Sequence, residues 1–147
     1  MFHLKNKKMM LMRYLFLLIF SLFSLTTVCA QEVKLSDGKQ IGSISSDGTI
    51  RNRSNAQIGK ISSDGTIRDR NNAQIGKIES DGTVRDRSGS QVGRIKSDGT
   101  VYDRNNSQIG KVESDGTVRN RQNSQIGKAS GVKREWVAVA FFFFYFN

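Results

Sequence analysis

The sequence contains no proline, one cysteine and one histidine, and this scarcity removes many of the side chains that enzymes use for catalysis. Both His3 and Cys29 lie within the first 30 residues, which have the pattern of a cleavable export signal. Once that signal is removed, the chain holds neither a thiol nor an imidazole. Disulfides, thiolate nucleophiles, Cys/His zinc sites and histidine general bases are therefore excluded. We expect no enzyme, no cofactor and no metal site.

The signal, residues 1–30, begins with basic residues and continues into an apolar run, Tyr14–Leu25. This run is too short to span a bilayer, because a spanning helix takes roughly 20 apolar residues. The end of the segment predicts cleavage before Gln31. Acylation of Cys29 is the alternative, but Val28 stands where lipoprotein signals carry a small residue. We expect an exported protein without lipid, in the periplasm, on the outer surface or secreted.

The positive charge of the chain persists after removal of the signal. Four basic residues leave with it, so 19 Lys and Arg face 13 Asp and Glu, a net charge of +6. For an exported protein this favours anionic envelope polymers, lipid head groups or acidic glycans as partners. We expect no nucleic-acid binding, because acids alternate with the basic residues and only Tyr102 is an aromatic among them.

An internal repeat of 17 residues organises most of the chain. The tripeptide Ser-Asp-Gly returns at this interval five times, and an Ile-Gly or Val-Gly pair keeps the same step. Residues 46–130 form five tandem units. Residues 31–45 precede them as an entry segment with a first strand, and residues 131–147 follow as an aromatic tail.

Each unit is typical of two short strands and two turns, because it is rich in Ile, Val, Thr and Arg and punctuated by Asp-Gly. The loop Ser63-Asp64-Gly65 fits a three-residue turn with its glycine in the left-handed region, and would set Ile61 opposite Ile67. The second connection is predicted as a four-residue loop, residues 71–74, with Ile67 opposite Ile78. The structural turn glycines are then Gly48, Gly65, Gly82, Gly99 and Gly116.

This pairing predicts an all-β fold, in which about ten short antiparallel strands carry one aliphatic belt. A flat meander would leave two open edges, so closure into a ring of five hairpin repeats is expected. A second set of glycines lies two residues before the first belt position of each unit, where something approaches closely or the strand bends. The belt residues are Ile44, Ile50, Ile61, Ile67, Ile78, Val84, Ile95, Val101, Val112 and Val118.

The tail contains the remaining concentrated apolar surface, residues 136–146. We expect it to pack against the belt or inside the ring. Helix and strand are both open for it, because it is apolar on every face. Membrane contact is the alternative and is less favoured, because ten apolar residues are too few for a helical span and a lone strand leaves its backbone unpaired in lipid.

Two sets of arginines repeat with the units, and both are predicted to face the same side of the sheet. Solvated surface charge is the favoured interpretation of such runs, and binding of an anionic ligand by the guanidinium groups is the alternative. Asp69, Asp86 and Asp103 could serve as calcium ligands, but turn capping and pairing with arginine are the favoured interpretation. The second arginine set is Arg51, Arg68, Arg85 and Arg119, broken at Tyr102. The complete set, which is the candidate ligand-binding set, is Arg53, Arg70, Arg87, Arg104 and Arg121.

The leader, the repeated pattern Gln-Ile-Gly-Lys-Ile-x-Ser-Asp-Gly-Thr-Val-Arg-Asp-Arg and the phenylalanine-rich end resemble the small exported proteins described as five-fold β-flowers. The resemblance implies the architecture, and it brings no established reaction and no functional residues. We expect an exported structural or binding module of the cell envelope that contacts an anionic glycan or a protein partner. The alternative is a membrane-associated envelope assembly factor, anchored by its aromatic tail.

Overall fold

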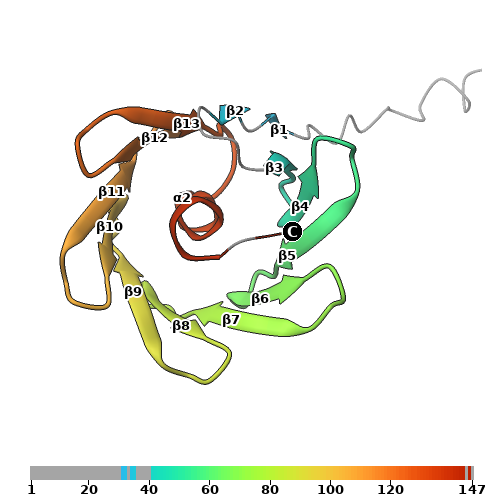
Figure 1. Ribbon diagram of the computed structural model, residues 1–147, viewed down its shortest axis with the longest axis horizontal. Helices are drawn as coiled ribbons and strands as arrows, with labels where there is room; N and C mark the ends of the chain where they lie inside the picture. Colours follow the sequence, from blue (N-terminus) through green and yellow to red (C-terminus); the bar gives the residue numbers. More distant parts are fainter. Residues whose placement is uncertain (1–30, 33, 36–40, 145, 147) are drawn as a thin grey trace, which may run out of the picture.

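One antiparallel β-sheet curls around a short C-terminal helix in the computed structural model, which describes residues 31–32, 34–35, 41–144 and 146 (Figure 1). The expected export signal lies outside the described residues. The all-β class and the 17-residue hairpin repeat are confirmed. Eleven strands form the antiparallel meander: β3 (Ile41–Ile44) of the entry segment, and β4 (Thr49–Asn52), β5 (Gln57–Ile61), β6 (Thr66–Asp69), β7 (Gln74–Ile78), β8 (Thr83–Asp86), β9 (Gln91–Ile95), β10 (Thr100–Asp103), β11 (Gln108–Val112), β12 (Thr117–Asn120) and β13 (Gln125–Lys128) of the repeats.

The sheet is not closed, so the prediction of a closed ring is wrong. In the strand order of the described residues, β3 and β13 are not neighbours. Both are odd strands of an antiparallel meander, so they run in the same direction and cannot join as an antiparallel pair. Two short strands of the entry segment lie beside these ends. β1 (Gln31–Glu32) pairs antiparallel with β3, and β2 (Lys34–Leu35) pairs antiparallel with β13.

The inner turns are the Ser-Asp-Gly loops, residues 46–48, 63–65, 80–82, 97–99 and 114–116. In each, the amide before the loop donates to the threonine carbonyl after it, as from Ser62 to Thr66 at 2.9 Å. Ile61 pairs with Ile67, which agrees with the predicted register. The turn glycines have φ between 82° and 85°, a conformation that glycine adopts without a Cβ clash. Each glycine carbonyl also accepts a bond from the next strand pair, as from the Ile78 amide to Gly65 at 2.9 Å.

The outer turns are three-residue loops as well, so the predicted four-residue loop 71–74 is wrong. They comprise residues 53–55, 70–72, 87–89, 104–106 and 121–123. The Asp69 amide donates to the Ala73 carbonyl at 3.0 Å, and Asn72 takes φ of 63°. Asparagine tolerates this left-handed conformation better than most residues, so it replaces glycine here.

Because the outer loops have three residues and not four, the register of each outer hairpin also differs from the prediction. Ile67 pairs with Gly76 and not with Ile78, and the register shifts by one residue between Ile67 and Arg68. The extra residue is Ile75, which lies in a β-bulge. All ten predicted belt residues are nevertheless buried, and they form one hydrophobic core with the tail.

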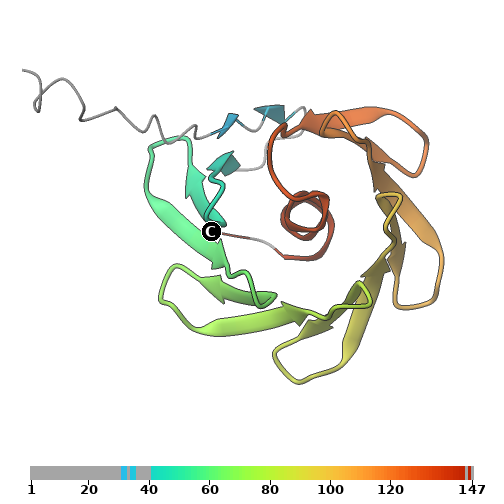
Figure 2. The same cartoon turned by 180° about the vertical axis from the view of Figure 1, so that it is seen from behind.

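The curled sheet forms an open ring, and the tail forms a helix that lies inside it in both views (Figures 1 and 2). It consists of α2 (Arg134–Ala138) and a widened π-helical turn, η1 (Val139–Phe143). Residues 136–141 and Phe146 are buried. The helix is not long and apolar enough to cross a membrane, and neither is any other helix of the described part.

Four strand glycines of the repeats each leave a seat, that is, space for one phenylalanine ring of the tail. A Cβ at any of these positions would overlap with the ring, so glycine alone leaves the space. Successive phenylalanines of the tail therefore face successive petals, the hairpins that carry the outer turns. Phe142 and Phe143 lie in the widened turn η1, whose rotation per residue is closer to one fifth of a turn than the roughly 100° of an α-helix, and Phe144 follows in an extended conformation. The pairs are Phe142 with Gly110, Phe143 with Gly93, Phe144 with Gly76 and Phe146 with Gly59.

Candidate functional site

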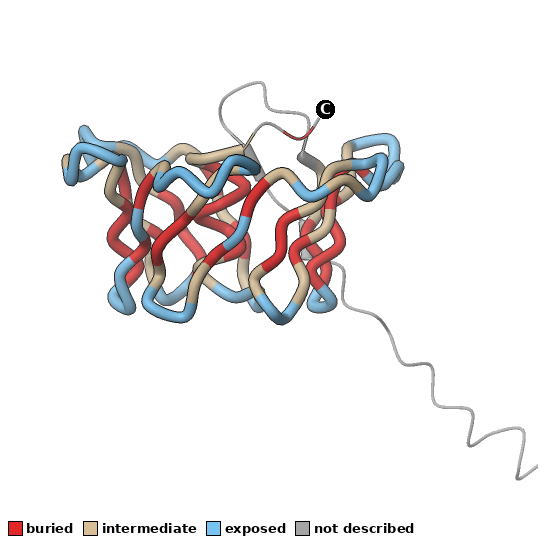
Figure 3. The backbone as a smooth tube through the Cα atoms, turned by 90° about the horizontal axis from the view of Figure 1, so that it is seen from below, coloured by how far each residue is buried: buried red, intermediate tan, exposed pale blue. Residues whose placement is uncertain are grey.

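The five arginines of the candidate binding set lie at the petal tips, one in each outer turn. Each is the first residue of its loop and is exposed, and the outer turns flare away from the ring axis at one end of the molecule (Figure 3). Their predicted place on a strand face is wrong, because the strands end one residue earlier, as β6 does at Asp69. None of the five has a hydrogen bond or ion pair to another described residue.

The second arginine set has a structural role. Arg68 Nη1 donates to the Asn72 carbonyl at 3.0 Å, which ties the strand to the left-handed residue of the outer turn. Arg51, Arg85 and Arg119 make the equivalent bond. Arg85 Nε also lies 2.9 Å from a Glu79 oxygen. The guanidinium groups of this set are therefore already hydrogen-bonded to their own outer turns, whereas those of the tip set have no partner among the described residues.

Tyr102 replaces the arginine of this second set in the fourth petal. The ammonium group of Lys96 lies 4.5 Å from the centre of the Tyr102 ring and 3.2 Å from its hydroxyl. This cation–π contact lies where the neighbouring petals have the exposed ion pairs Arg85–Glu79 and Arg119–Glu113.

Acidic residues at the base of the outer turns act as caps. Asp69 Oδ1 accepts bonds from the Asn71 and Ala73 amides, both at 2.9 Å. Asp86 and Asp103 do the same in their petals. Within the described residues, no group of three His, Cys, Asp or Glu side chains is placed to hold a metal ion. Asp69, Asp86 and Asp103, the possible calcium ligands, therefore cap the outer turns.

The inner turns carry a second row of carboxylates. Asp64 accepts bonds from the Thr66 amide and hydroxyl, each at 3.0 Å. The bond from the Thr66 amide, followed by that from its hydroxyl, lowers the pKa of Asp64. In the last repeat the Thr117 amide and hydroxyl and then Lys128 lower the pKa of Asp115 to about 2. These side chains stay charged and hold the turns.

The net charge of residues 41–147 is concentrated at the outer turns. Residues 41–147 contain 17 Lys and Arg and 11 Asp and Glu. Nine of these arginines and three of the aspartates lie in the outer-turn segments, residues 51–56, 68–73, 85–90, 102–107 and 119–124, which gives +6. The rest of 41–147 has eight charges of each sign and sums to zero. The positive excess thus lies at one end of the ring.

Sequence reasoning missed the asparagine turns, the capping role of the second arginine set and the match of phenylalanines to glycines. A signal for the first was present, because Asn55, Asn72, Asn106 and Asn123 repeat at the glycine position of the turn and Gly89 completes the set.

A ring of tandem hairpins around its own aromatic tail defines a class of small repeat proteins that present five similar loops at one end. The chain matches the model of the 5-fold beta-flower protein family over residues 30–145, and it belongs to that family. No curated protein and no solved structure matches it.

Proposed function

We propose that this protein is an exported, non-enzymatic binding module of the cell envelope that holds an anionic glycan on its outer turns. The carrying observation is the set of five tip arginines, which are exposed and have no partner among the described residues. A guanidinium group binds carboxylate, sulfate or phosphate through paired hydrogen bonds. Because five such groups lie on one scaffold, their individually weak contacts with a polymer combine into a higher overall affinity.

The distribution of charge supports the same ligand class. The outer-turn segments carry the full +6 of residues 41–147, so a polyanion is steered to this end of the ring. The carboxylates that acid–base catalysis would need are bonded to turn amides, as Asp69 is, which favours a binding role over an enzymatic one.

A membrane-associated assembly factor anchored by the aromatic tail is the second candidate. Burial of residues 136–141 weighs against it, because these side chains pack in the core and are not free to enter lipid. Export itself is part of the proposal, and the mass of the exported protein tests it. An N-terminus at Gln31 without lipid supports export and cleavage, whereas a diacylglyceryl group on Cys29 contradicts it.

Binding to dextran sulfate, with uncharged dextran as the reference, tests the ligand class. Replacement of the five tip arginines by glutamine should weaken binding about a hundredfold at low salt and flatten its dependence on salt, because ion release sets that slope. The matched control also removes five positive charges, one from each of the strands β5, β7, β9, β11 and β13. The control substitutions are Lys60→Gln, Lys77→Gln, Arg94→Gln, Lys111→Gln and Lys128→Gln.

The control should weaken binding by less than about tenfold, since only the long-range attraction falls. Equal losses in both variants would mean that net charge alone attracts the polymer and that the petal tips are not the site.

A further inference from the structure

The inner hairpins, each of which consists of two strands joined by an inner turn, carry opposed basic residues on their outward faces. Lys60 of β5 lies directly opposite Arg68 of β6, and both point away from the core because their neighbours Ile61 and Ile67 point into it. Like charges that face each other across two strands repel and are destabilising. Such a pair therefore favours an anion beside it.

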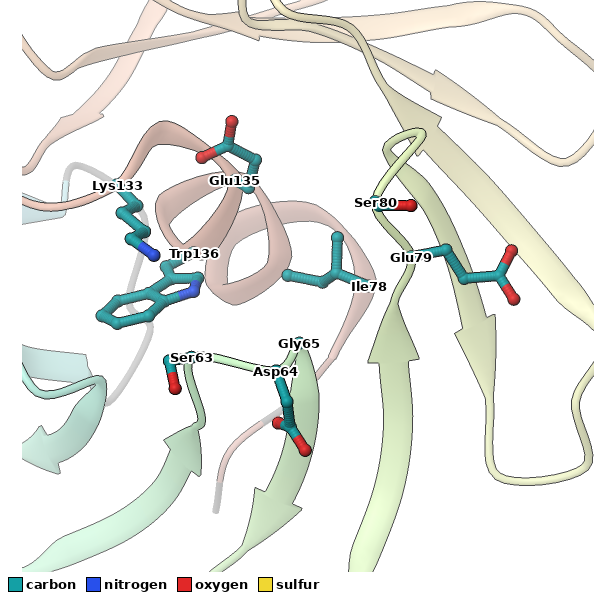
Figure 4. Close-up of a pocket in the computed structure, with 9 residues that line it drawn as sticks. All are labelled: Ser63, Asp64, Gly65, Ile78, Glu79, Ser80, Lys133, Glu135 and Trp136. Carbon is teal, nitrogen blue, oxygen red and sulfur yellow. The ribbon is translucent and has the colours of Figure 1, made fainter.

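In two of these hairpins a glutamate supplies the anion. Arg85 Nε donates to Glu79 Oε1 at 2.9 Å. One carboxylate oxygen of Glu113 lies 3.5 Å from Lys111 Nζ, and the other lies 3.7 Å from Arg119 Nε. Figure 4 shows that the Glu79 side chain points away from the tail helix, which places it on the outer face of the sheet. The hairpin thus has a position for one carboxylate beside its two cations.

The hairpin of β5 and β6 has both cations and no carboxylate at this position. Ser62 corresponds to Glu79 and Glu113, because it precedes them by one and three repeat lengths. Neither Lys60 Nζ nor Arg68 Nε has a hydrogen bond or ion pair to another described residue, and the same holds for the Ser62 hydroxyl. The donors that hold glutamate in other repeats are therefore available here.

The two remaining inner hairpins do not reproduce this combination. In β3 and β4, Ser43 lies opposite Arg51, so the pair has one cation. In β9 and β10, Arg94 lies opposite Tyr102, and Lys96 at the glutamate position contacts the tyrosine ring. Among the five inner hairpins, all of which the structure describes, only that of β5 and β6 has two opposed cations without a carboxylate or an aromatic ring beside them.

Arg68 holds its guanidinium group as Arg85 does. In both side chains Nη1 donates to a carbonyl of the outer turn at 3.0 Å, that of Asn72 for Arg68 and that of Gly89 for Arg85. This bond leaves Nε and Nη2, which form the other edge of the group, as paired donors. Two such N–H groups match the two oxygens of a carboxylate. Arg68 therefore presents the edge that Arg85 presents to Glu79.

A nearby aspartate does not prevent Lys60 from holding a second carboxylate. Hydrogen bonds from the following threonine, and to a smaller extent the charge of Lys60, lower the pKa of Asp47. Lys111 stands in the same relation to Asp98. Lys111 nevertheless forms its ion pair with Glu113, so the equivalent ammonium group serves two carboxylates in the fifth hairpin.

We propose that Lys60, Ser62 and Arg68 bind the carboxylate of a small organic acid. The carboxylate takes the place that Glu79 fills in the next hairpin, with the guanidinium edge of Arg68 on one side and the ammonium group of Lys60 on the other. The Ser62 hydroxyl is a third donor. The site lies on the wall of the ring and uses none of the tip arginines, so it goes beyond the proposed glycan site.

Titration of the full chain with sodium acetate tests this site, and acetamide is the neutral molecule of the same shape. Ionic strength is held constant with sodium chloride, and the Nε–H resonances of the arginines are followed by NMR. The Arg68 resonance should shift saturably with acetate and not with acetamide, whereas that of Arg85, which Glu79 already occupies, should not shift. An Arg68 resonance that does not saturate, or equal shifts at Arg68 and Arg85, would overturn the proposal.

Ser62→Glu supplies the carboxylate from the chain itself and should abolish the acetate response. Ser63→Glu is the matched control, because it adds the same charge at the exposed neighbouring position and should retain the response. Glu113→Ser should do the reverse and create a second response at Arg119. A response retained in Ser62→Glu, lost equally in Ser63→Glu or not gained in Glu113→Ser would contradict the location.

Replacement of the five tip arginines by glutamine should leave the acetate titration at Arg68 unchanged. Failure of the glycan site and failure of this carboxylate site are therefore distinguishable. Loss of the acetate response in the tip variant would show that the wall site is not independent of the tips and would contradict the proposal.

Discussion

The inner and outer turns have the same three-residue geometry, yet they differ in the residue at the left-handed position. The inner turns use glycine, and a Cβ at Gly82 would overlap with the Ile95 carbonyl oxygen of the next strand. Four outer turns use asparagine, and Gly89 of the fifth has nothing within 4 Å of its Cβ position. Glycine thus marks the turns that pack against a neighbouring strand, and asparagine marks the turns that are free.

The inner turns therefore have a structural role, whereas the proposed binding residues lie in the outer turns. The inner turns are bonded to the next petal and carry carboxylates that stabilise the loop, as Asp64 does. The tips of the outer turns do not pack against a neighbouring strand, and the arginines of the proposed glycan site are among the residues exposed there. The tail adds a second asymmetry, because it begins at the inner-turn end and its phenylalanines fill the seats nearer the outer turns.

Removal of the tail should have the largest effect on stability, because the tail fills the centre of the core that supports both the inner and the outer turns. A chain truncated after Lys133 should lose its cooperative thermal transition. It loses the buried aromatics Trp136 and Phe141, each of which buries roughly 150 to 250 Å², together with the buried residues 137–140 between them. Circular dichroism during heating checks this. A cooperative melt with β-type signal in the truncated chain would show that the sheet is stable alone.

A pair of alanine substitutions sharpens the difference between the turns. Gly82→Ala and Gly89→Ala place a Cβ at the same φ of 83°, but only the first meets the Ile95 carbonyl. We expect a loss of about 3 kcal/mol for Gly82→Ala and about 1 kcal/mol for Gly89→Ala in urea unfolding. Equal losses would mean that backbone conformation alone selects glycine in the inner turns.

Acid should weaken the inner turns selectively. Hydrogen bonds from the following threonine lower the pKa of each inner-turn aspartate, so the folded state keeps these groups charged where the unfolded chain binds protons. Their contribution is complete above the unfolded pKa of about 4 and is lost as the pH falls toward the lowered folded values. The groups are Asp47, Asp64, Asp81, Asp98 and Asp115.

Melting temperatures measured from pH 5 to pH 2 check this, and they should fall over the lower part of that range. Asp115→Asn should reduce the fall, because an amide oxygen still accepts from the Thr117 amide but does not titrate. A melting temperature that is constant over the range would contradict the role of these carboxylates.

The smallest effect is expected at the free turn. Gly89→Asn installs the residue that the other four outer turns carry at φ of 62° to 63°, with open space around it. The free energy of unfolding should change by no more than about 0.5 kcal/mol. A loss as large as that expected for Gly82→Ala would show that the outer turns are packed after all.

The sequence allowed prediction of the features that depend on local chemistry. Ser-Asp-Gly at a fixed interval gave the inner turns and the pairing of Ile61 with Ile67, and the aliphatic positions gave the belt. The outer register was missed because asparagine at Asn72 behaves as glycine would, and one residue was absorbed in a bulge.

Two features depend on relations between distant segments: that the sheet stays open, and that the tail packs against the strand glycines. That β3 and β13 run in the same direction follows from an odd number of strands, which the count of about ten did not reveal. The seats at Gly59, Gly76, Gly93 and Gly110 were recognised as places of close approach, but nothing in the sequence paired each with its phenylalanine. For the tip arginines, exposure follows from composition, whereas their freedom from partners needed the structure.

The most direct test of the ring and tail as one unit is the NMR spectrum of the strand glycines in Phe144→Leu. Because an aromatic ring shifts only nuclei close to it, loss of the Phe144 ring should move the Gly76 resonances and leave those of Gly93 and Gly110 unchanged. This pattern would follow from one phenylalanine per glycine seat. Resonances of Gly76 that stay in place, or glycines of all petals that move together, would contradict it.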